Sequence, residues 1–478
     1  MNSHGNYING SWIPGSEYRD NINPSDTSDV VGRYTRSGVG AIDDAVSSAR
    51  AALPAWSRTS PQVRADLLEA VAREILAEAP RLGELLAREE GKTLPEAIGE
   101  VTRAAHIFRF FSGEAVRMRG ERQPSTREGV SINLHREPVG VIGVITPWNF
   151  PIAIPAWKCA PALAYGNTVV LKPAELVPAS AVALAGIIHR VGFPAGVFNL
   201  VIGQGSVLGD AISNHEGIDA VTFTGSEAVG TAVAVAGARR LAAVQLEMGG
   251  KNPLIVLADA DLDVAVACAI NGAFFSTGQR CTASSRLIVE APIHDEFLER
   301  MLARMGTLRV GNALDPATEI GPVVDQRQLD TDLKYIDAAR STPGLEVHGG
   351  ERVQRDTEGF FLSPALVVGS TNEDVATREE IFGPVASVIK VGDYDEAVSV
   401  ANDTPFGLAA GICTTTLARA EDYQARADAG MVMINLPTAG VDPHVAFGGR
   451  KRSSYGPREQ GAQAQEFFTQ TKTAYVRP

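Results

Sequence analysis

The spacing of apolar residues changes along the chain. Between about residues 40 and 120, apolar positions recur every three or four residues, as in IDDAVSSARAAL and in the long run bracketed by Pro61 and Gly91. This period is typical of amphipathic helices, and proline at the start with glycine after the end marks their usual boundaries. The first part of the chain is therefore predicted to be largely helical.

Beyond residue 140, short apolar runs alternate with helical stretches. The first series contains VIGVIT, NTVVLK, GVFNLV and DAVTFTG, and a second contains NPLIVL, SRLIVE, a helix over about 293–306, FFLSPALVV and AGICTTT. Such alternation predicts parallel strands joined by right-handed crossovers. Two further segments, 123–140 and the final EFFTQTKTAYVR, are predicted as exposed strands that could extend a sheet of this chain or of a partner subunit.

Composition narrows the class of protein. With 478 residues, of which 45% are hydrophobic and 21% charged, the chain can bury a large core and is expected to form two or three domains. The net charge of −13 and the absence of a basic run argue against a nucleic-acid partner. Neither a targeting segment nor an apolar run of the ~20 residues that span a bilayer is visible, so we expect a cytoplasmic protein without a membrane partner.

The four cysteines differ in their surroundings. They lie far apart without metal-ligand spacing, so neither disulfides nor a bound metal is expected. Cys159, Cys268 and Cys413 lie in apolar stretches and are interpreted as buried structural residues. Cys281 instead lies in FSTGQRCTASS, where glycine-exposed N–H groups and the neighbouring Arg280 would favour the reactive thiolate. Cys281 is therefore the candidate nucleophile.

Two glycine patterns compete as phosphate loops. GQGSVLG at 203–209 has one residue too many for the G-x-G-x-x-G fingerprint and is interpreted as a turn that opens a helix. FTGSEAVG follows the strand DAVTF directly, so Gly225, Ser226 and the N–H groups of a helix from about Glu227 could hold a pyrophosphate. A plain strand-to-helix turn explains that stretch equally well.

The stretch VVLKPAE adds to the evidence for a nucleotide. A strand that ends at Lys172 and is followed by Glu175 places a cation and a carboxylate at the carboxyl edge of a parallel sheet, where nucleotides bind. A carboxylate there can accept both hydroxyls of an adenosine ribose and would repel a 2′-phosphate. Two exposed surface charges are the alternative.

Six motifs together carry a family resemblance: TPWNFP at 146–151, LKPAE at 171–175, FTGS at 223–226, EMGGKNP at 247–253, GQRC at 278–281 and EEIFGP at 379–384. In this order and spacing they resemble the aldehyde dehydrogenase superfamily, from about Tyr7 to the C-terminal strand. The resemblance departs from the family's usual pattern at Met248, at Ala446 and in the segment 450–461, and this last departure bears on the substrate range.

The resemblance implies an α/β fold of three parts. These are a variant Rossmann cofactor domain (1–121 and 140–248), an α/β catalytic domain (249–449) and a small β extension (122–139 and 462–478) that joins subunits into homodimers or homotetramers. It also implies NAD or NADP as the cofactor, and Glu175 favours NAD. The cofactor contacts that it implies are Trp148, Lys172, Glu175, Gly225, Ser226, Glu380 and Phe382.

The same resemblance assigns the chemistry to four residues. Cys281 would attack an aldehyde, and the side chain of Asn149 with the Cys281 N–H would hold the resulting oxyanion. Glu247, before a glycine pair, would activate the water that hydrolyses the thioester, and Lys158 would support the site.

The same residues bear on other classes of function. A cofactor-free cysteine hydrolase would need a histidine partner for Cys281, and no motif marks one. An acylating dehydrogenase that passes the thioester to coenzyme A would gain nothing from Glu247. A general aliphatic or aromatic aldehyde dehydrogenase and a non-catalytic protein of the same fold stay open as alternatives.

The substrate is expected to carry a carboxylate. The tail FGGRKRSSYGPREQG resembles the branch of the family that oxidises semialdehydes of dicarboxylic acids, in particular 2-oxoglutarate semialdehyde, with succinate semialdehyde as a smaller analogue. A local guanidinium must then compensate the desolvation of that carboxylate. Arg280 is the first candidate, and Arg103, His106 and Arg109 of a predicted helix are further candidates.

Overall fold

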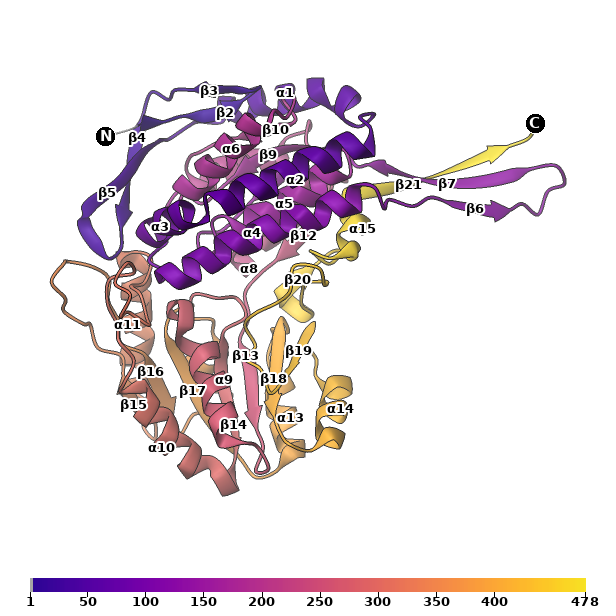
Figure 1. Ribbon diagram of the computed structural model, residues 1–478. Coiled ribbons are helices and arrows are strands. Elements are labelled where there is room, and N and C mark those ends of the chain that lie inside the picture. The colour runs from indigo at the N-terminus through magenta and orange to yellow at the C-terminus, as the bar shows by residue number, and fades with distance from the viewer. Residues whose placement is uncertain (1–2) are drawn as a thin grey trace.

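The computed structural model describes residues 3–478, and its upper half in Figure 1 is built on an eight-stranded sheet. The strand order is β20-β12-β11-β8-β9-β10-β2-β3, and the central strands β8 to β12 run parallel. The strands are β2 (Asn6–Ile8), β3 (Ser11–Ile13), β8 (Val141–Ile145), β9 (Thr168–Lys172), β10 (Phe198–Leu200), β11 (Ala220–Thr224), β12 (Ala243–Glu247) and β20 (Ser454–Tyr455).

The helices of this half pack against that sheet and against one another (Figure 1). The run after Pro61 forms two helices rather than one, because Pro80 has no N–H to donate to a preceding turn and its ring clashes there. The helices are α1 (Gly40–Trp56), α2 (Pro61–Ala77), α3 (Ala79–Glu90), α4 (Leu94–Ala115), α5 (Ala153–Ala164), α6 (Ala179–Val191), α7 (Gly205–Asn214) and α8 (Glu227–Arg239).

The lower half is built on a seven-stranded sheet of order β15-β16-β17-β14-β13-β18-β19, in which only β15 runs antiparallel to its neighbour. Of the run FFLSPALVV, only the residues after Pro364 form a strand. The strands are β13 (Asn252–Val256), β14 (Ser284–Glu290), β15 (Glu346–Gly349), β16 (Ala365–Val368), β17 (Val385–Val391), β18 (Ala409–Cys413) and β19 (Met431–Ile434). The helices are α9 (Leu262–Phe274), α10 (His294–Met305), α11 (Gln326–Arg340), α12 (Val375–Arg378), α13 (Tyr394–Asn402) and α14 (Leu417–Arg426).

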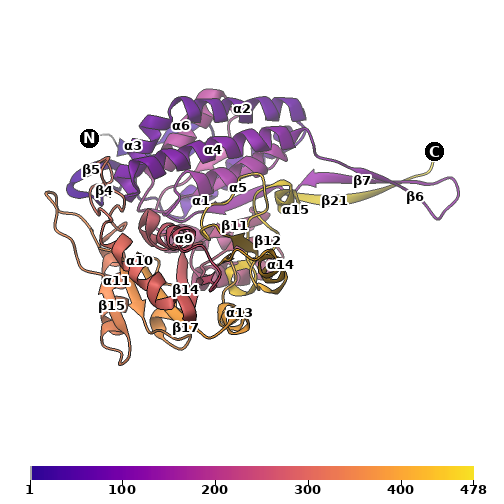
Figure 2. The ribbon, with the colours of Figure 1, turned by 60° about the horizontal axis from the view of Figure 1, so that its bottom comes forward.

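A three-stranded antiparallel arm projects from the body in Figures 1 and 2. It consists of β6 (Glu121–Pro124), β7 (Ser131–Pro138) and β21 (Thr469–Val476), so both segments predicted as exposed strands are confirmed and pair with each other. The short helix α15 (Gln465–Phe468) anchors its base through two buried phenylalanines. Near the N-terminus, β1 (Ser3–His4), β4 (Tyr18–Asn23) and β5 (Asp26–Thr35) form another small sheet.

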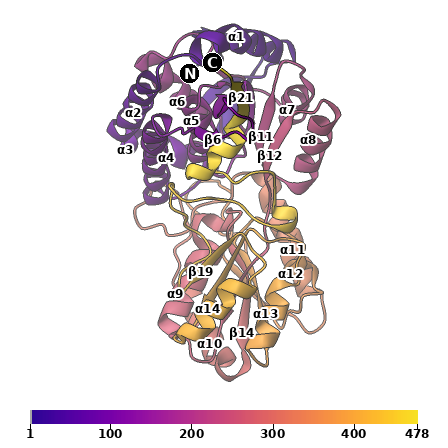
Figure 3. The same cartoon turned by 90° about the vertical axis from the view of Figure 1, so that its right-hand side faces the viewer.

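The chain crosses between the two halves twice. It passes from β12 directly into β13, and it returns after β19 through a segment that Figure 3 shows in yellow between the halves. This returning segment adds β20 to the edge of the upper sheet beside Glu247. The boundaries of the three expected domains stay a prediction. Within residues 3–478, the structure has no helix that is both long and apolar enough to span a bilayer.

Candidate active site

A tight turn after α9 presents Cys281. Ser276, Thr277 and Gly278 all have left-handed backbone angles, with φ of 52°, 56° and 65°. At Gly278 a side chain is excluded as well, because a Cβ would lie 2.2 Å from the carbonyl oxygen of Gly383. Residues other than glycine rarely adopt this backbone conformation, and backbone strain of this kind concentrates at functional sites. The turn therefore fixes where the thiol points.

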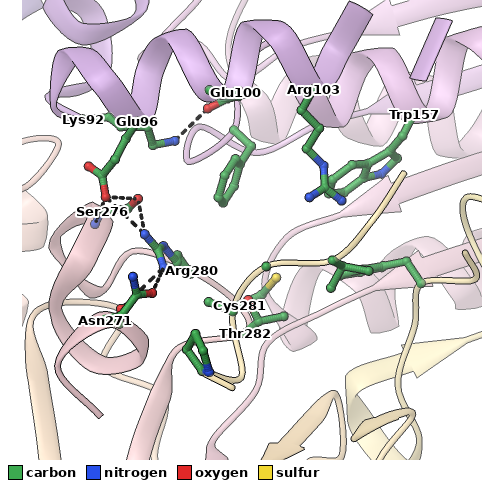
Figure 4. Close-up of a pocket in the computed structure, with 17 residues that line it drawn as sticks. Lys92, Glu96, Glu100, Arg103, Trp157, Asn271, Ser276, Arg280, Cys281 and Thr282 are labelled. Atoms are coloured by element: carbon green, nitrogen blue, oxygen red, sulfur yellow. Dashed lines mark hydrogen bonds and ion pairs between the residues drawn. The ribbon is translucent and has the colours of Figure 1, made fainter. Parts of the chain in front are cut away.

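The thiol opens onto a cavity of about 470 Å³ between α4, α5 and the loop 437–447 (Figure 4). Aromatic rings of Phe150, Trp157 and Phe447 form part of its wall. Its charged lining consists of Lys92, Glu96, Glu100, Arg103 and Arg280. A small molecule with both an apolar and an ionic part fits such a lining.

The environment of Cys281 disfavours the thiolate. Burial raises the pKa of the Cys281 thiol to about 12, and the carboxylates of Glu380 and Glu247 contribute in the same direction. The cation expected beside the thiol is turned away, because Arg280 forms an ion pair of 3.1 Å with Glu96 and a hydrogen bond of 2.9 Å to Ser276 Oγ. In this arrangement the cysteine is a protonated thiol at neutral pH.

Asn149 lies against the turn that carries Cys281. Its buried amide Nδ2 donates a 3.0 Å hydrogen bond to the carbonyl oxygen of Gln279. Lys92 Nζ donates to the backbone oxygen of Asn149 at 2.7 Å and fixes the segment from the other side. The structure thus brings Asn149 and Cys281, which are far apart in sequence, into one cluster.

Glu247 ends β12 and is buried. Burial raises its pKa well above the usual value, the nearby Glu459 raises it further, and a hydrogen bond from Ser454 Oγ opposes both effects. Lys158 of α5 forms a buried ion pair with Glu459 and donates to Thr222 Oγ1 at 2.8 Å. Burial therefore makes the Glu247 carboxylate a stronger proton acceptor than an exposed glutamate.

Glu459 and Ser454 were missed at the sequence level. Both lie in the segment 450–461, whose unusual sequence was expected to bear on the substrate range. None of these residues lines the cavity directly, but Ser454 and Glu459 contact Glu247 and Lys158, and Gln460 of the same segment accepts a hydrogen bond from the cavity residue Arg103. No spacing rule relates this segment to Lys158, since 301 positions separate Lys158 from Glu459.

The carboxyl ends of β9 and β11 carry the candidate nucleotide contacts. Burial lowers the pKa of Lys172 to about 8, and no carboxylate among residues 3–478 lies within ion-pair distance of its Nζ. Glu175 Oε1 lies 3.4 Å from Nη1 of Arg19 in β4, a partner that the sequence did not suggest. Ser226 is the N-cap of α8, and its side chain makes no capping bond, so the first-turn N–H groups are free for an anion.

The GQGSVLG segment forms the turn that opens α7, as predicted.

Glu380 and Phe382 lie near Gly250, the second of the two glycines that follow Glu247. The N–H of Gly250 donates to Glu380 Oε1 at 2.9 Å, and burial raises the pKa of Glu380 to about 7. A Cβ at Gly249 would lie 1.9 Å from this carboxylate, so only glycine admits the contact. The Phe382 ring meets Trp148 edge-on, with centroids 5.3 Å apart.

These groups fit a dinucleotide. The cation and carboxylate at the sheet edge suit the first ribose of such a cofactor, and the helix N-terminus suits its pyrophosphate. The second carboxylate, near the thiol, suits the other ribose. Within residues 3–478, no group of three or more His, Cys, Asp or Glu side chains is arranged to hold a metal ion.

Such a fold and site define a dehydrogenase with a cysteine nucleophile. The sequence profile of the aldehyde dehydrogenase family matches residues 12–474, so the chain belongs to this family, whose members oxidise aldehydes with NAD or NADP. The chain is 42% identical to the alpha-ketoglutaric semialdehyde dehydrogenase of Bacillus subtilis, over all of this chain and 99% of the relative. It is 40% identical to the 2,5-dioxopentanoate dehydrogenase of Saccharolobus solfataricus, over 97% of each chain.

Solved structures agree with the fold. Betaine aldehyde dehydrogenase from Staphylococcus aureus in complex with NAD⁺ superposes with a TM-score of 0.96 at 32% identity, covering 99% of this chain and 95% of that chain. The α/β fold with a Rossmann-like cofactor part, expected from the six motifs, is thereby confirmed.

Proposed function

We propose that this protein oxidises the semialdehyde of a dicarboxylic acid, first of all 2-oxoglutarate semialdehyde, to the corresponding dicarboxylate. The observation that carries the proposal is the charge of the cavity in front of Cys281, where three cationic side chains face two carboxylates. A substrate carboxylate would balance this excess of positive charge. Relatives named for this substrate, at 42% and 40% identity over nearly the whole chain, support the same assignment.

Four residues carry the proposed chemistry. Cys281 loses its thiol proton to solvent in the cavity and attacks the aldehyde carbon as the thiolate, and Asn149 Nδ2 with the Cys281 N–H holds the oxygen that becomes negative. One such donor is worth about 3 kcal/mol in the transition state. Glu247 takes a proton from the water that then hydrolyses the thioester, and Lys158 holds the adjacent Glu459 as an ion pair.

The cofactor supplies an acceptor for the hydride of the aldehyde. We propose that Lys172 and Glu175 contact its adenosine ribose, that Gly225 and Ser226 hold its pyrophosphate, and that Trp148, Glu380 and Phe382 position the nicotinamide end. We also propose a moderate preference for NAD, because Glu175 accepts ribose hydroxyls and repels a 2′-phosphate. Arg19 beside Glu175 limits this preference, since it could turn toward such a phosphate.

The arm and the surface charge bear on the assembly of the protein and on its place in the cell. The projecting arm offers strand edges to a second subunit, which supports a homodimer or homotetramer. The net charge of −13 gives no basic face for nucleic acid, and we propose a cytoplasmic location.

A steady-state screen tests the proposed function. The purified protein is assayed with 2-oxoglutarate semialdehyde, succinate semialdehyde, pentanal and butanal, each with NAD and with NADP, by the absorbance of the reduced nicotinamide. We expect a higher kcat/KM for each semialdehyde acid than for the uncharged aldehyde of equal length. A preference for pentanal and butanal would show a general aldehyde dehydrogenase, and no reduction with any aldehyde would indicate a non-catalytic protein.

A further inference from the structure

Three cations line the substrate cavity, and two of them already have a carboxylate partner. Lys92 Nζ lies 2.7 Å from Glu100 Oε2, and Arg280 Nη2 lies 3.1 Å from Glu96 Oε1. Glu90 Oε2 lies 3.9 Å from Lys92 Nζ. Burial raises the pKa of Glu90 to about 8, so this carboxyl group is mostly protonated and uncharged at neutral pH. The surplus positive charge of the cavity therefore does not belong to Lys92 or Arg280.

Arg103 is the remaining cation. No carboxylate among residues 3–478 lies within 4.0 Å of its guanidinium, and its single hydrogen bond runs from Nη2 to Gln460 Oε1 at 3.2 Å. Its Nε is buried without any partner. Asp442, on the loop over the cavity, is exposed and lies outside ion-pair distance of the Arg103 guanidinium. A desolvated guanidinium with unpaired donors is costly unless an anion completes it.

The surroundings hold Arg103 in place. Its guanidinium carbon lies 5.8 Å from the centroid of the Trp157 ring, and Gln460 fixes it from behind. Gln460 itself is fully buried with a left-handed backbone, φ 56°, and its amide Nε2 is also unpaired. Arg103 and Gln460 together thus have more hydrogen-bond donors than acceptors. The strained backbone of Gln460 is of the kind found at binding sites. Figure 4 shows Arg103 reaching from α4 into the cavity that Cys281 also lines.

We infer that Arg103 binds the terminal carboxylate of the substrate while its aldehyde end reaches Cys281. This inference rests on the proposed function and names the residue that selects an acidic substrate. It moves the role from Arg280, whose guanidinium is engaged by Glu96 and by the turn that carries the thiol. Arg280 then acts as a positioning residue for Cys281.

The variant Arg103→Gln tests the assignment on matched substrates. For 2-oxoglutarate semialdehyde against pentanal, we expect the ratio of kcat/KM values to fall about 30-fold to 150-fold, the loss of a charged contact worth about 2 to 3 kcal/mol. Arg280→Gln should lower kcat/KM for both substrates by the same factor and leave the ratio unchanged. The control is Arg109→Gln on the same helix, which is ion-paired to Glu69 at the surface and should change neither value. An altered ratio in Arg280→Gln with none in Arg103→Gln would overturn the inference.

A second readout separates this inference from the proposed function. Glutarate has a carboxylate at each end and no aldehyde, so it should slow alkylation of Cys281 by iodoacetamide in the wild type and not in Arg103→Gln. If the wild type prefers pentanal while this protection holds, the proposed function fails and the carboxylate site at Arg103 stands. If glutarate does not protect the wild type, there is no such site. Arg103→Lys, which keeps the charge, should retain part of the protection, and thermal unfolding shows whether each variant folds.

Discussion

The cofactor edge and the substrate cavity are built differently. At the proposed cofactor edge, Lys172 ends β9 and Ser226 is the N-cap of α8, so these two proposed contacts lie in local strand–turn–helix units. The cavity instead joins α4, α5, the Cys281 turn and the loop 437–447, four segments that are not adjacent in the sequence. Its charges are arranged through pairs such as Arg280 with Glu96, separated by 184 positions. The proposed contacts at Lys172 and Ser226 are thus encoded locally, whereas the proposed substrate selection depends on tertiary pairing.

The first test of this difference between the cofactor edge and the substrate cavity removes the Cys281 thiol. Cys281→Ala should lower turnover by about 10⁴-fold or more, because the nucleophile is lost. Binding of the reduced cofactor, followed by its fluorescence, should stay within about twofold of the wild type, because the cofactor edge is separate. Aldehyde oxidation retained by this variant would refute the mechanism.

The second test concerns the protonation of the thiol. Because burial raises the pKa of Cys281 to about 12, its alkylation by iodoacetamide without cofactor should rise about tenfold per pH unit from pH ~7 to ~10, close to 10³-fold in all. An unperturbed cysteine, with a pKa of about 8.5, would level off above pH ~9. Cys281→Ala gives the background from the three buried cysteines. A plateau near pH ~9 would show that the cavity does not suppress the thiolate.

The third test separates hydride transfer from hydrolysis. Glu247→Gln should still give a burst of reduced cofactor and then turn over about 100-fold more slowly, because only the later step needs a base. Stopped-flow absorbance measures both phases. Ser454→Ala serves as a comparison, because it removes the hydrogen bond to Glu247 but keeps the carboxylate. A variant with no burst, and with normal hydrolysis of a preformed thioester, would assign Glu247 another role.

The fourth and smallest effect is at the cofactor edge. Glu175→Gln should shift the ratio of kcat/KM for NAD over NADP by about tenfold toward NADP, because it removes a charge that repels a 2′-phosphate and leaves Arg19 without its partner. Glu69→Gln, a surface carboxylate on α2, is the matched control. An unchanged ratio in Glu175→Gln would mean that this carboxylate lies away from the adenosine ribose.

The helices and strands were largely predictable, and the errors have local causes. The helix from Glu227 and the segments that form the three-stranded arm were expected where they occur. Pro80 and Pro364 account for the split helix and the shortened strand, because a proline nitrogen donates no hydrogen bond. The orientation of Arg280 could not be read from its place next to Cys281, since neighbouring side chains can point to opposite sides of a turn.

The sequence by itself determined the class of chemistry, because a cysteine among glycine and polar residues, a carboxylate before two glycines and the strand-end motifs each act over a few residues. Only the tertiary structure decided which charges are neutralised. Glu96 forms an ion pair with Arg280, Glu459 forms one with Lys158, and Arg103 has no carboxylate partner among residues 3–478. The physical reason is that the energy of a buried charge depends on which groups lie within a few ångströms of it, and here those groups come from distant segments that meet only in the folded chain.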